Sequence, residues 1–136
     1  MTTPMDVLLS RASTDRLQDP APDRAQLEQI LATALRAPDH GRLQPWRYVI
    51  VQGEARSILA ENVVASTLRV APQTPQFNLD KRRQRMATMP MTIVLGMHLH
   101  PEHKIPLWEQ EMSVAAGAMN ILNALHALGF GGIWVS

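Results

Sequence analysis

The feature that most constrains the fold is a long apolar segment between residues 107 and 128. Apolar side chains recur around its whole circumference: Met112, Val114, Ala115, Met119, Ile121, Leu122, Leu125 and Leu128. A helix that is apolar nearly all round must be buried on most of its sides. The sequence therefore predicts a long, largely buried helix over residues 107–128, ended by Gly129 as the residue after the helix.

One narrow sector of this helix is small or polar. At about 100° per residue, that sector contains Glu109, Ser113, Ala116, Asn120, Asn123 and Ala127. Such a stripe permits close packing of another helix, or of the same helix from a second subunit. The simpler alternative is that its amides and hydroxyls are hydrogen-bonded inside the core.

The remaining patterns mix helices and strands. Apolar runs rich in strand formers predict strands at Arg47–Val51 and Met91–Leu99, with Gly132–Ser136 as a third. Helical spacing predicts helices over residues 5–11, 24–37 and 55–69. Asp23 is expected to cap the second of these helices, with Gln26 completing a capping box. The fold class predicted is α+β, a central sheet flanked by helices.

The stretch from Arg36 to Trp46 concentrates polar groups in a stiff turn. Pro38 ends the preceding helix, because proline disfavours helical geometry at the residue before it. Pro45 opens the next strand, where a missing N–H does least harm. Arg36 and His40 could bind an anion or a heterocycle. The alternative is a helix C-terminus with favourable cations and one anchoring tryptophan.

Bulk composition excludes several classes of protein. The 136 residues suffice for one domain with a core, and the net charge of +1 argues against a dedicated nucleic-acid binder. The absence of cysteine excludes disulfide scaffolds and thiolate chemistry. Neither a signal peptide nor an apolar run of about 20 residues is visible. We therefore expect a cytoplasmic protein that does not enter membranes.

Two basic segments could attract anions. Arg11, Ser13 and Arg16 form one short polar segment in which a guanidinium could hold a phosphate; the alternative is a solvated surface turn. Residues 70–90 are the most polar and least regular part of the chain, and Pro72 and Pro75 are expected to break it. Within this part, Lys81–Arg85 carries four positive charges. We expect a solvated helix face there. The functional alternative is a mobile segment near a substrate entrance.

Histidines and glycines mark two further places. The exit of the second predicted strand carries His98, His100, Glu102 and His103, and these histidines could share a metal ion. No cysteine or second carboxylate cluster supports that idea, so we predict no metal site. Gly131 and Gly132 allow the backbone to approach a ligand closely, which suits a phosphate or a ring edge.

Six segments occur in a characteristic order: Leu8–Leu17, Asp19–Pro22, Arg36–Trp46, His103–Pro106, Trp108–Ser113 and Leu128–Ser136. Together they resemble the FMN-dependent nitroreductase family, most closely its minimal, YdjA-like branch of NAD(P)H nitroreductases. The first segment looks like the family's opening Arg-Arg/His-Ser-x-x-Arg motif. The resemblance extends from about Met5 to the last residue.

The resemblance implies a nitroreductase-like fold and a homodimer with FMN at the subunit interface. It implies an oxidoreductase that uses NAD(P)H to reduce nitroaromatics, quinones or related electron-poor small molecules by ping-pong hydride transfer. FMN would carry this chemistry, so no side chain is predicted to be catalytic. The alternative is a non-catalytic flavin-binding or interaction module.

The resemblance also implies particular site residues. Arg11 is expected at the FMN phosphate, Ser13 at the ribityl–phosphate region, and Arg36 and His40 reach the flavin from the partner subunit. The full predicted FMN set is Arg11, Ala12, Ser13, Arg36, His40, Trp134, Val135 and Ser136. A segment that relatives use for the nicotinamide nucleotide matches Ala124, Leu125, His126, Ala127, Leu128 and Gly129.

The chain departs from the family pattern in three ways. Ala12 stands where a second basic residue is usual, which removes one phosphate contact. Val135 stands where close relatives carry arginine. Family chains continue with another helix and a final strand, so residues 1–136 are expected to form a single nitroreductase-like domain that is incomplete at its C-terminus.

Overall fold

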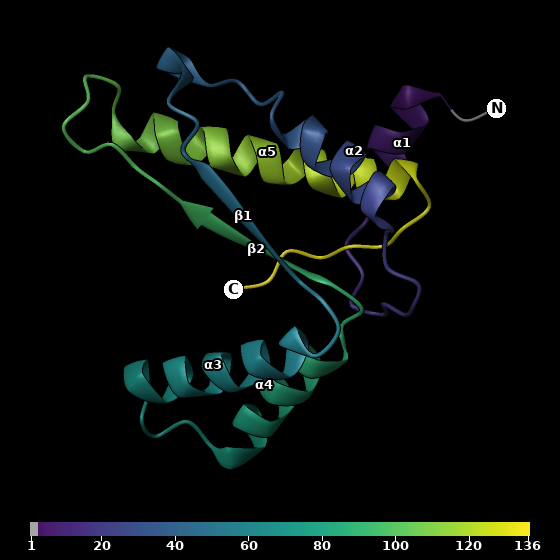
Figure 1. Cartoon of the computed structure of the whole chain (residues 1–136), viewed down its shortest axis with the longest axis vertical. Coiled ribbons are helices and arrows are strands. Elements are labelled where there is room, and N and C mark those ends of the chain that lie inside the picture. The colour runs from purple at the N-terminus through teal and green to yellow at the C-terminus, as the bar shows by residue number, and fades with distance from the viewer. Residues whose placement is uncertain (1–2) are drawn as a thin grey trace. The chain divides into compact units, whose positions relative to one another are not determined.

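The computed structural model describes residues 3–136 (Figure 1). Its elements, in chain order, are α1 (Pro4–Ser10), α2 (Arg24–Ala34), the 3-10 turn η1 (His40–Arg42), β1 (Trp46–Val51), α3 (Ala55–Val70), α4 (Gln76–Thr88), β2 (Thr92–Met97) and α5 (Leu107–Ala127). This mixture confirms the predicted α+β class. None of the helices in this part of the chain is long and apolar enough to cross a membrane.

The strands β1 and β2 pair in a two-stranded sheet. The N–H of His98, just after β2, donates to the carbonyl of Pro45, just before β1 (2.7 Å), so the strands run antiparallel. The prediction of a third strand at Gly132–Ser136 was wrong: these residues follow α5 as an irregular segment. A strand needs a neighbour for its backbone groups, and the sheet of the described residues holds β1 and β2 alone.

The chain divides into two compact units. The first comprises residues 3–17, 21–48 and 95–136, and the second comprises residues 18–20 and 49–94. In the first unit α2 packs along α5. The side chains of Ser113 and Asn120 donate to the carbonyls of Pro38 (2.5 Å) and Thr33 (2.9 Å). The stripe of α5 thus admits a second helix, as the sequence suggested, and Ser113 and Asn120 are paired there. The Oδ1 atom of Asn123, in contrast, is buried without a hydrogen-bond partner.

Close approach of these helices depends on Gly117. A Cβ atom added at Gly117 would lie 3.2 Å from the carbonyl oxygen of Ala34 in α2 and 2.9 Å from the Tyr48 hydroxyl. Nearby, Trp46, Ala37 and Val114 form a buried cluster. The core of the first unit therefore lies where α5 meets α2 and the start of β1.

The boundaries of α2 illustrate how local signals set a helix. Asp23 and Gln26 form the predicted capping box, with bonds of 2.8 and 3.0 Å. The helix ends at Ala34, three residues before the predicted end. Its last turn tightens: the N–H groups of Arg36 and Ala37 donate three residues back, to Thr33 and Ala34. Such bonds satisfy carbonyls that a helix end would otherwise leave free.

The second unit is built on a pair of helices, α3 and α4. Residues 70–90 were predicted to be irregular, but α4 occupies Gln76–Thr88 within them. The proline signal was misread: Pro75 is the residue that precedes the first helical turn, where proline is harmless. Lys81–Arg85 lies on this helix, mostly exposed, which confirms the expectation of a solvated helix face.

Candidate functional site

A pocket of about 260 Å³ lies in the first unit, at the end of α5. Its walls are the end of α1 with the segment that follows it, and the last turns of α5 with the glycine-rich segment beyond. The lining residues are Ser10, Arg11, Ala12, Ser13, Thr14, Leu122, His126, Phe130, Gly131 and Gly132. We call this hollow the α1–α5 pocket.

Two hydrogen bonds close the pocket around Ser10. Its hydroxyl donates to the carbonyl of Asp6 within α1 (2.5 Å). The same oxygen lies 2.8 Å from Nε2 of His126, in the last turn of α5. Ser10 and His126 are therefore the side chains that join α1 to the end of α5.

The segment that follows α1 brings a guanidinium and a hydroxyl together. Arg11 Nη1 donates to Ser13 Oγ at 3.5 Å, which is a long bond. The N–H of Thr14 donates to the carbonyl of Gly132 (3.2 Å), so this segment is tied to the glycine-rich segment after α5. A Cβ at Gly131 would lie 2.8 Å from Leu17 and 3.0 Å from Thr14. Only glycine lets these two segments approach so closely.

The Arg36–Trp46 turn forms a second structured place in the same unit. Asp39 accepts bonds from the N–H groups of Leu43 (3.2 Å) and Gln44 (2.9 Å). Three residues have left-handed backbones: Gly41 (φ 75°), Arg42 (φ 53°) and Gln44 (φ 48°). Left-handed backbone is uncommon outside glycine, and such strain often accompanies function.

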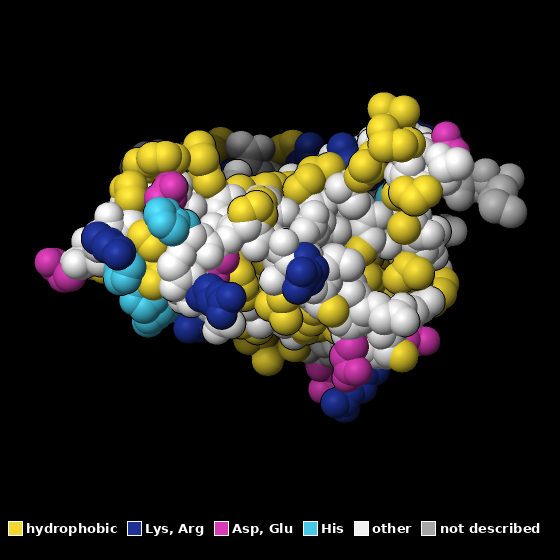
Figure 2. All heavy atoms as spheres, turned by 90° about the horizontal axis from the view of Figure 1, so that it is seen from above, with side chains coloured by type: hydrophobic (Ala, Val, Ile, Leu, Met, Phe, Trp, Pro, Cys, Tyr) yellow, Lys and Arg dark blue, Asp and Glu magenta, His cyan; other side chains and the backbone are white. Residues whose placement is uncertain are grey.

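The loop between β2 and α5 packs against this turn. Gln110, which is 2% exposed, holds the loop through three hydrogen bonds: it accepts from the His100 N–H (2.8 Å) and donates to the carbonyls of His100 (3.1 Å) and Ile105 (2.9 Å). Ile105 in turn contacts the position of Gly41 so closely that an added Cβ would clash. His40 Nδ1 lies 3.1 Å from Glu109 Oε2. Figure 2 shows histidine side chains gathered near basic ones at one end of the visible face.

The structure brings together one part of the predicted site. Arg11, Ala12 and Ser13 share the α1–α5 pocket with His126. Arg36 is exposed after the end of α2, and His40 lies in η1. The C-terminal segment 134–136 is also exposed, with Trp134 at 57%. The pocket is not lined by Arg36 or His40, and it is not lined by residues 134–136.

Several pocket residues were not foreseen from the sequence as ligand contacts. Ser10, Thr14 and Phe130 line the pocket, and no local motif singles them out. Asp39 and Gln110 fix the turn and the loop through backbone hydrogen bonds. The sequence signal for Gln110 was a lone amide on a helix that is otherwise apolar.

The proposed sharing of a metal by histidines finds little support in the fold. The rings of His98 and His100 lie edge to face with centroids 5.0 Å apart. Over residues 3–136, no three histidine, aspartate or glutamate side chains are grouped so that they could hold one ion. His103 Nδ1 instead accepts the N–H of Ile105 (3.2 Å).

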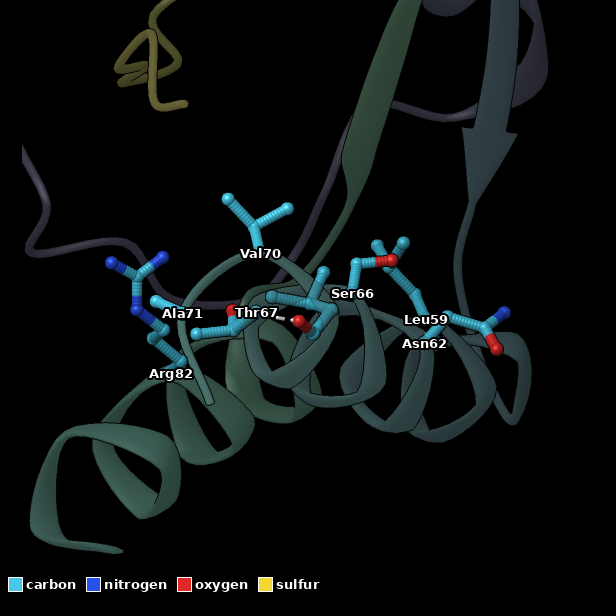
Figure 3. A pocket seen from close by; sticks show the side chains of 8 residues that line it. Leu59, Asn62, Ser66, Thr67, Val70, Ala71 and Arg82 are labelled. Atoms are coloured by element: carbon cyan, nitrogen blue, oxygen red, sulfur yellow. Dashed lines mark hydrogen bonds between the residues drawn. The ribbon is translucent and has the colours of Figure 1, made fainter. Parts of the chain in front are cut away.

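A larger hollow lies in the second unit, along α3 and α4. This groove has about 510 Å³ and is lined by Leu59, Asn62, Val63, Ser66, Thr67, Val70, Ala71 and Arg82. Figure 3 shows Arg82 extending from α4 beside Ala71. The Thr67 hydroxyl donates a hydrogen bond to the carbonyl of Val63 in its own helix (2.8 Å). The groove is therefore open and mostly apolar, with little that could orient a ligand.

Comparison with known proteins places this chain in a family. The model of the "Nitroreductase family" matches residues 8–136. The chain is 37% identical over 132 residues to the Escherichia coli (strain K12) protein named "Putative NAD(P)H nitroreductase YdjA", covering 97% of this chain and 71% of that protein. A Haemophilus influenzae protein named "Putative NAD(P)H nitroreductase" is 31% identical over 133 residues, with the same coverage.

Solved structures agree with these sequence matches. A nitroreductase-like family protein from Bacillus cereus superposes with a TM-score of 0.82 at 26% identity, over 100% of this chain and 71% of that one. A nitroreductase from Desulfovibrio desulfuricans, solved in complex with FMN, gives a TM-score of 0.72 at 19% identity, over 100% and 69%. The fold is nitroreductase-like, and the chain belongs to the nitroreductase family, a family of oxidoreductases.

Proposed function

We propose that this protein is an FMN-dependent oxidoreductase that uses NAD(P)H to reduce nitroaromatics, quinones or related electron-poor small molecules. The named relatives and the FMN-bound neighbour support this proposal. The observation that carries it is the α1–α5 pocket, in which Arg11 and Ser13 of the opening motif meet the glycine-rich segment after α5.

The residues of the pocket fit the phosphate-bearing end of FMN. Arg11 supplies a permanent positive charge, Ser13 a hydroxyl, and Gly131 a backbone with no side chain. The volume of about 260 Å³ is below the usual range of about 300–1,000 Å³ for ligand pockets. The pocket therefore suits part of the cofactor, and other residues must hold the rest.

We assign the rest of the flavin to residues outside the pocket. Trp134, Val135 and Ser136 would lie against the ring, and Arg36 and His40 would come from a partner subunit. An arginine beside the ring would stabilise negative charge that develops there. Residues 124–129 remain the proposed nicotinamide segment. When bound, FMN supplies the redox chemistry by taking hydride from NAD(P)H and passing it to the acceptor.

An exposed apolar face of α5 supports the homodimer. Trp108 (57% exposed), Met112 (64%) and Met119 (39%) recur at helical spacing on this long helix. Exposed apolar side chains that recur along one face mark surfaces for other proteins. A second copy of the chain is the occupant we propose, and we place the dimer in the cytoplasm.

The first test is retention of FMN. Purified protein is mixed with FMN, desalted, and examined by absorbance and on a sizing column. A yellow protein that elutes as a dimer supports the proposal. A colourless protein that elutes as a monomer contradicts it for this chain. Oxidation of NAD(P)H with a quinone or nitroaromatic acceptor then separates an enzyme from a non-catalytic flavin binder.

Matched arginine variants sharpen this test. Arg11→Gln should lose at least about tenfold in FMN affinity, since charge-assisted bonds to phosphate are strong. Arg16→Gln is the control, because Arg16 lies in the same segment but does not line the pocket. Arg36→Ala should weaken FMN binding or lower its reduction potential. Equal affinity in the Arg11 and Arg16 variants would contradict the assignment of Arg11.

A further inference from the structure

We infer that His126 is a proton-dependent anchor for the phosphate end of the flavin: its protonated ring binds the phosphate more tightly than its neutral ring does. This inference rests on the proposed function, because it needs FMN in the α1–α5 pocket. It places His126 at the phosphate, while the other residues of the segment 124–129 remain the proposed nicotinamide segment.

Hydrogen-bond geometry fixes which ring nitrogen carries a proton. The Ser10 hydroxyl has one proton, which it donates to the carbonyl of Asp6 (2.5 Å). Its oxygen can then only accept from His126, so Nε2, at 2.8 Å, must bear an N–H. Nδ1 is left as the nitrogen that gains or loses a proton. Protonation adds a positive charge to the ring without breaking the bond to Ser10.

The ring belongs to the wall of the pocket. His126 is half-buried in the last turn of α5. It lines the same pocket as Arg11 and Ser13. A phosphate there would have a fixed cation on one side and a switchable cation on the other.

Other charged groups near this ring are few. Along α5, no charged side chain follows Glu111 except His126 itself. On α1, the Asp6 carboxylate accepts bonds from Thr3 (2.8 Å). Asp15 and Arg16 are exposed beyond the pocket segment. Among the described residues that line the pocket, Arg11 and His126 are the ionisable ones. Arginine keeps its charge, so His126 is the lining side chain whose charge can change.

The test measures FMN affinity by quenching of flavin fluorescence between pH 6 and 8.5. The variants are His126→Gln, which keeps an N–H donor for Ser10 but cannot be charged, and His126→Ala, which removes both. FMN phosphate titrates itself near about pH 6, but that effect is common to all three proteins. The ratio of wild-type to His126→Gln affinity therefore isolates the ring. Riboflavin, which lacks the phosphate, is the second ligand.

At pH 6 the wild type should bind FMN about fivefold more tightly than His126→Gln does, because charge-assisted bonds are strong. At pH 8.5 the two proteins should bind FMN equally tightly. Riboflavin affinity should not depend on His126. A constant ratio across pH, or an equal effect on riboflavin, would overturn the inference while leaving the flavoprotein assignment intact. Failure of wild type and variants alike to bind FMN at any pH would overturn both. Circular dichroism of each variant verifies folding.

Discussion

The α1–α5 pocket holds about 260 Å³, whereas the groove along α3 and α4 holds about 510 Å³. The groove is the larger, yet its walls are two consecutive helices with one side chain of fixed charge, Arg82. The pocket gathers segments around residues 10–14 and 122–132, and its polar groups bond one another. The groove has the larger volume, but distant polar groups converge in the pocket, and on that ground we propose the pocket as the site for the flavin.

The two units also differ in the interactions that stabilise each of them internally. In the first, Gln110, Ser113 and Asn120 donate to backbone carbonyls at least partly shielded from water. In the second, Arg83 of α4 pairs with Glu61 (2.7 Å) and Asp80 (2.9 Å) on the surface. Buried donors are expensive to leave unpaired, while exposed ion pairs contribute little. Mutations should therefore be costly in the first unit and mild in the second.

The largest effect is expected at Gln110. Gln110→Ala leaves the His100 N–H and the Ile105 carbonyl without their partners, while the His100 carbonyl keeps the His103 N–H. We therefore expect a loss of about 3 kcal/mol in unfolding free energy. Urea unfolding followed by circular dichroism measures it. Gln84→Ala is the matched control, because Gln84 is exposed on α4. Similar losses in both variants would break the contrast between the units.

Next in size is Gly117→Ala. Alanine normally gains about 1 kcal/mol over glycine in a helix. Here its Cβ would press on the Ala34 carbonyl and the Tyr48 hydroxyl, and overpacking costs about 1–3 kcal/mol. We expect a net loss and a lower Tm. The Tyr48 hydroxyl is buried without a hydrogen-bond partner, so Tyr48→Phe should be nearly neutral and should restore part of the loss. No rescue would mean that the helix spacing is not set at this contact.

A smaller effect is expected for the ion pair of the second unit. The hydrogen bond that Arg83 donates to Glu61, together with the negative charge of Glu61, raises the pKa of Arg83, but both side chains face solvent. A double-mutant cycle of Arg83→Gln and Glu61→Gln should give a coupling of about 0.5 kcal/mol that falls as salt is added. A coupling above about 2 kcal/mol would show that this pair behaves as a buried one.

The smallest effect concerns the start of α1. Bonds from the backbone and side chain of Thr3 lower the pKa of Asp6. A lowered pKa stabilises the fold above the unfolded value of about 3.9, and this contribution disappears as pH falls through the folded value. The Tm difference between wild type and Asp6→Asn should therefore shrink on acidification. A difference that stays constant from pH 7 to pH 2 would contradict this role of the capping box.

Sequence reasoning worked best where signals are local. The capping box of Asp23 and Gln26, the glycine after α5 (Gly129, φ 85°) and the apolar run of α5 each act over a few residues, and all three were confirmed. The misreading of residues 70–90 was also local, since Pro75 begins α4 instead of breaking it. The family and fold followed from the order of motifs along the chain.

The pocket could be predicted only in part. The opening motif gave Arg11 and Ser13, and the resemblance gave His126 as part of the nicotinamide segment; all three line the pocket. Ser10 escaped notice because its importance depends on Asp6 one turn before it and on His126 across the fold. Geometry of that kind leaves no periodicity in the sequence. The predicted strand at 132–136 failed for the same reason, because pairing depends on a neighbour that local pattern does not reveal.

The bond between Ser10 and His126 joins positions 116 residues apart. Closing so long a loop costs chain entropy, and contacts of this kind form late in folding. During synthesis, the α3–α4 pair can assemble as soon as residue 88 has emerged, while the pocket cannot close until residue 132 is made. A nascent chain therefore holds no complete α1–α5 pocket, and under the proposed function FMN would bind there only after residue 132 has been made.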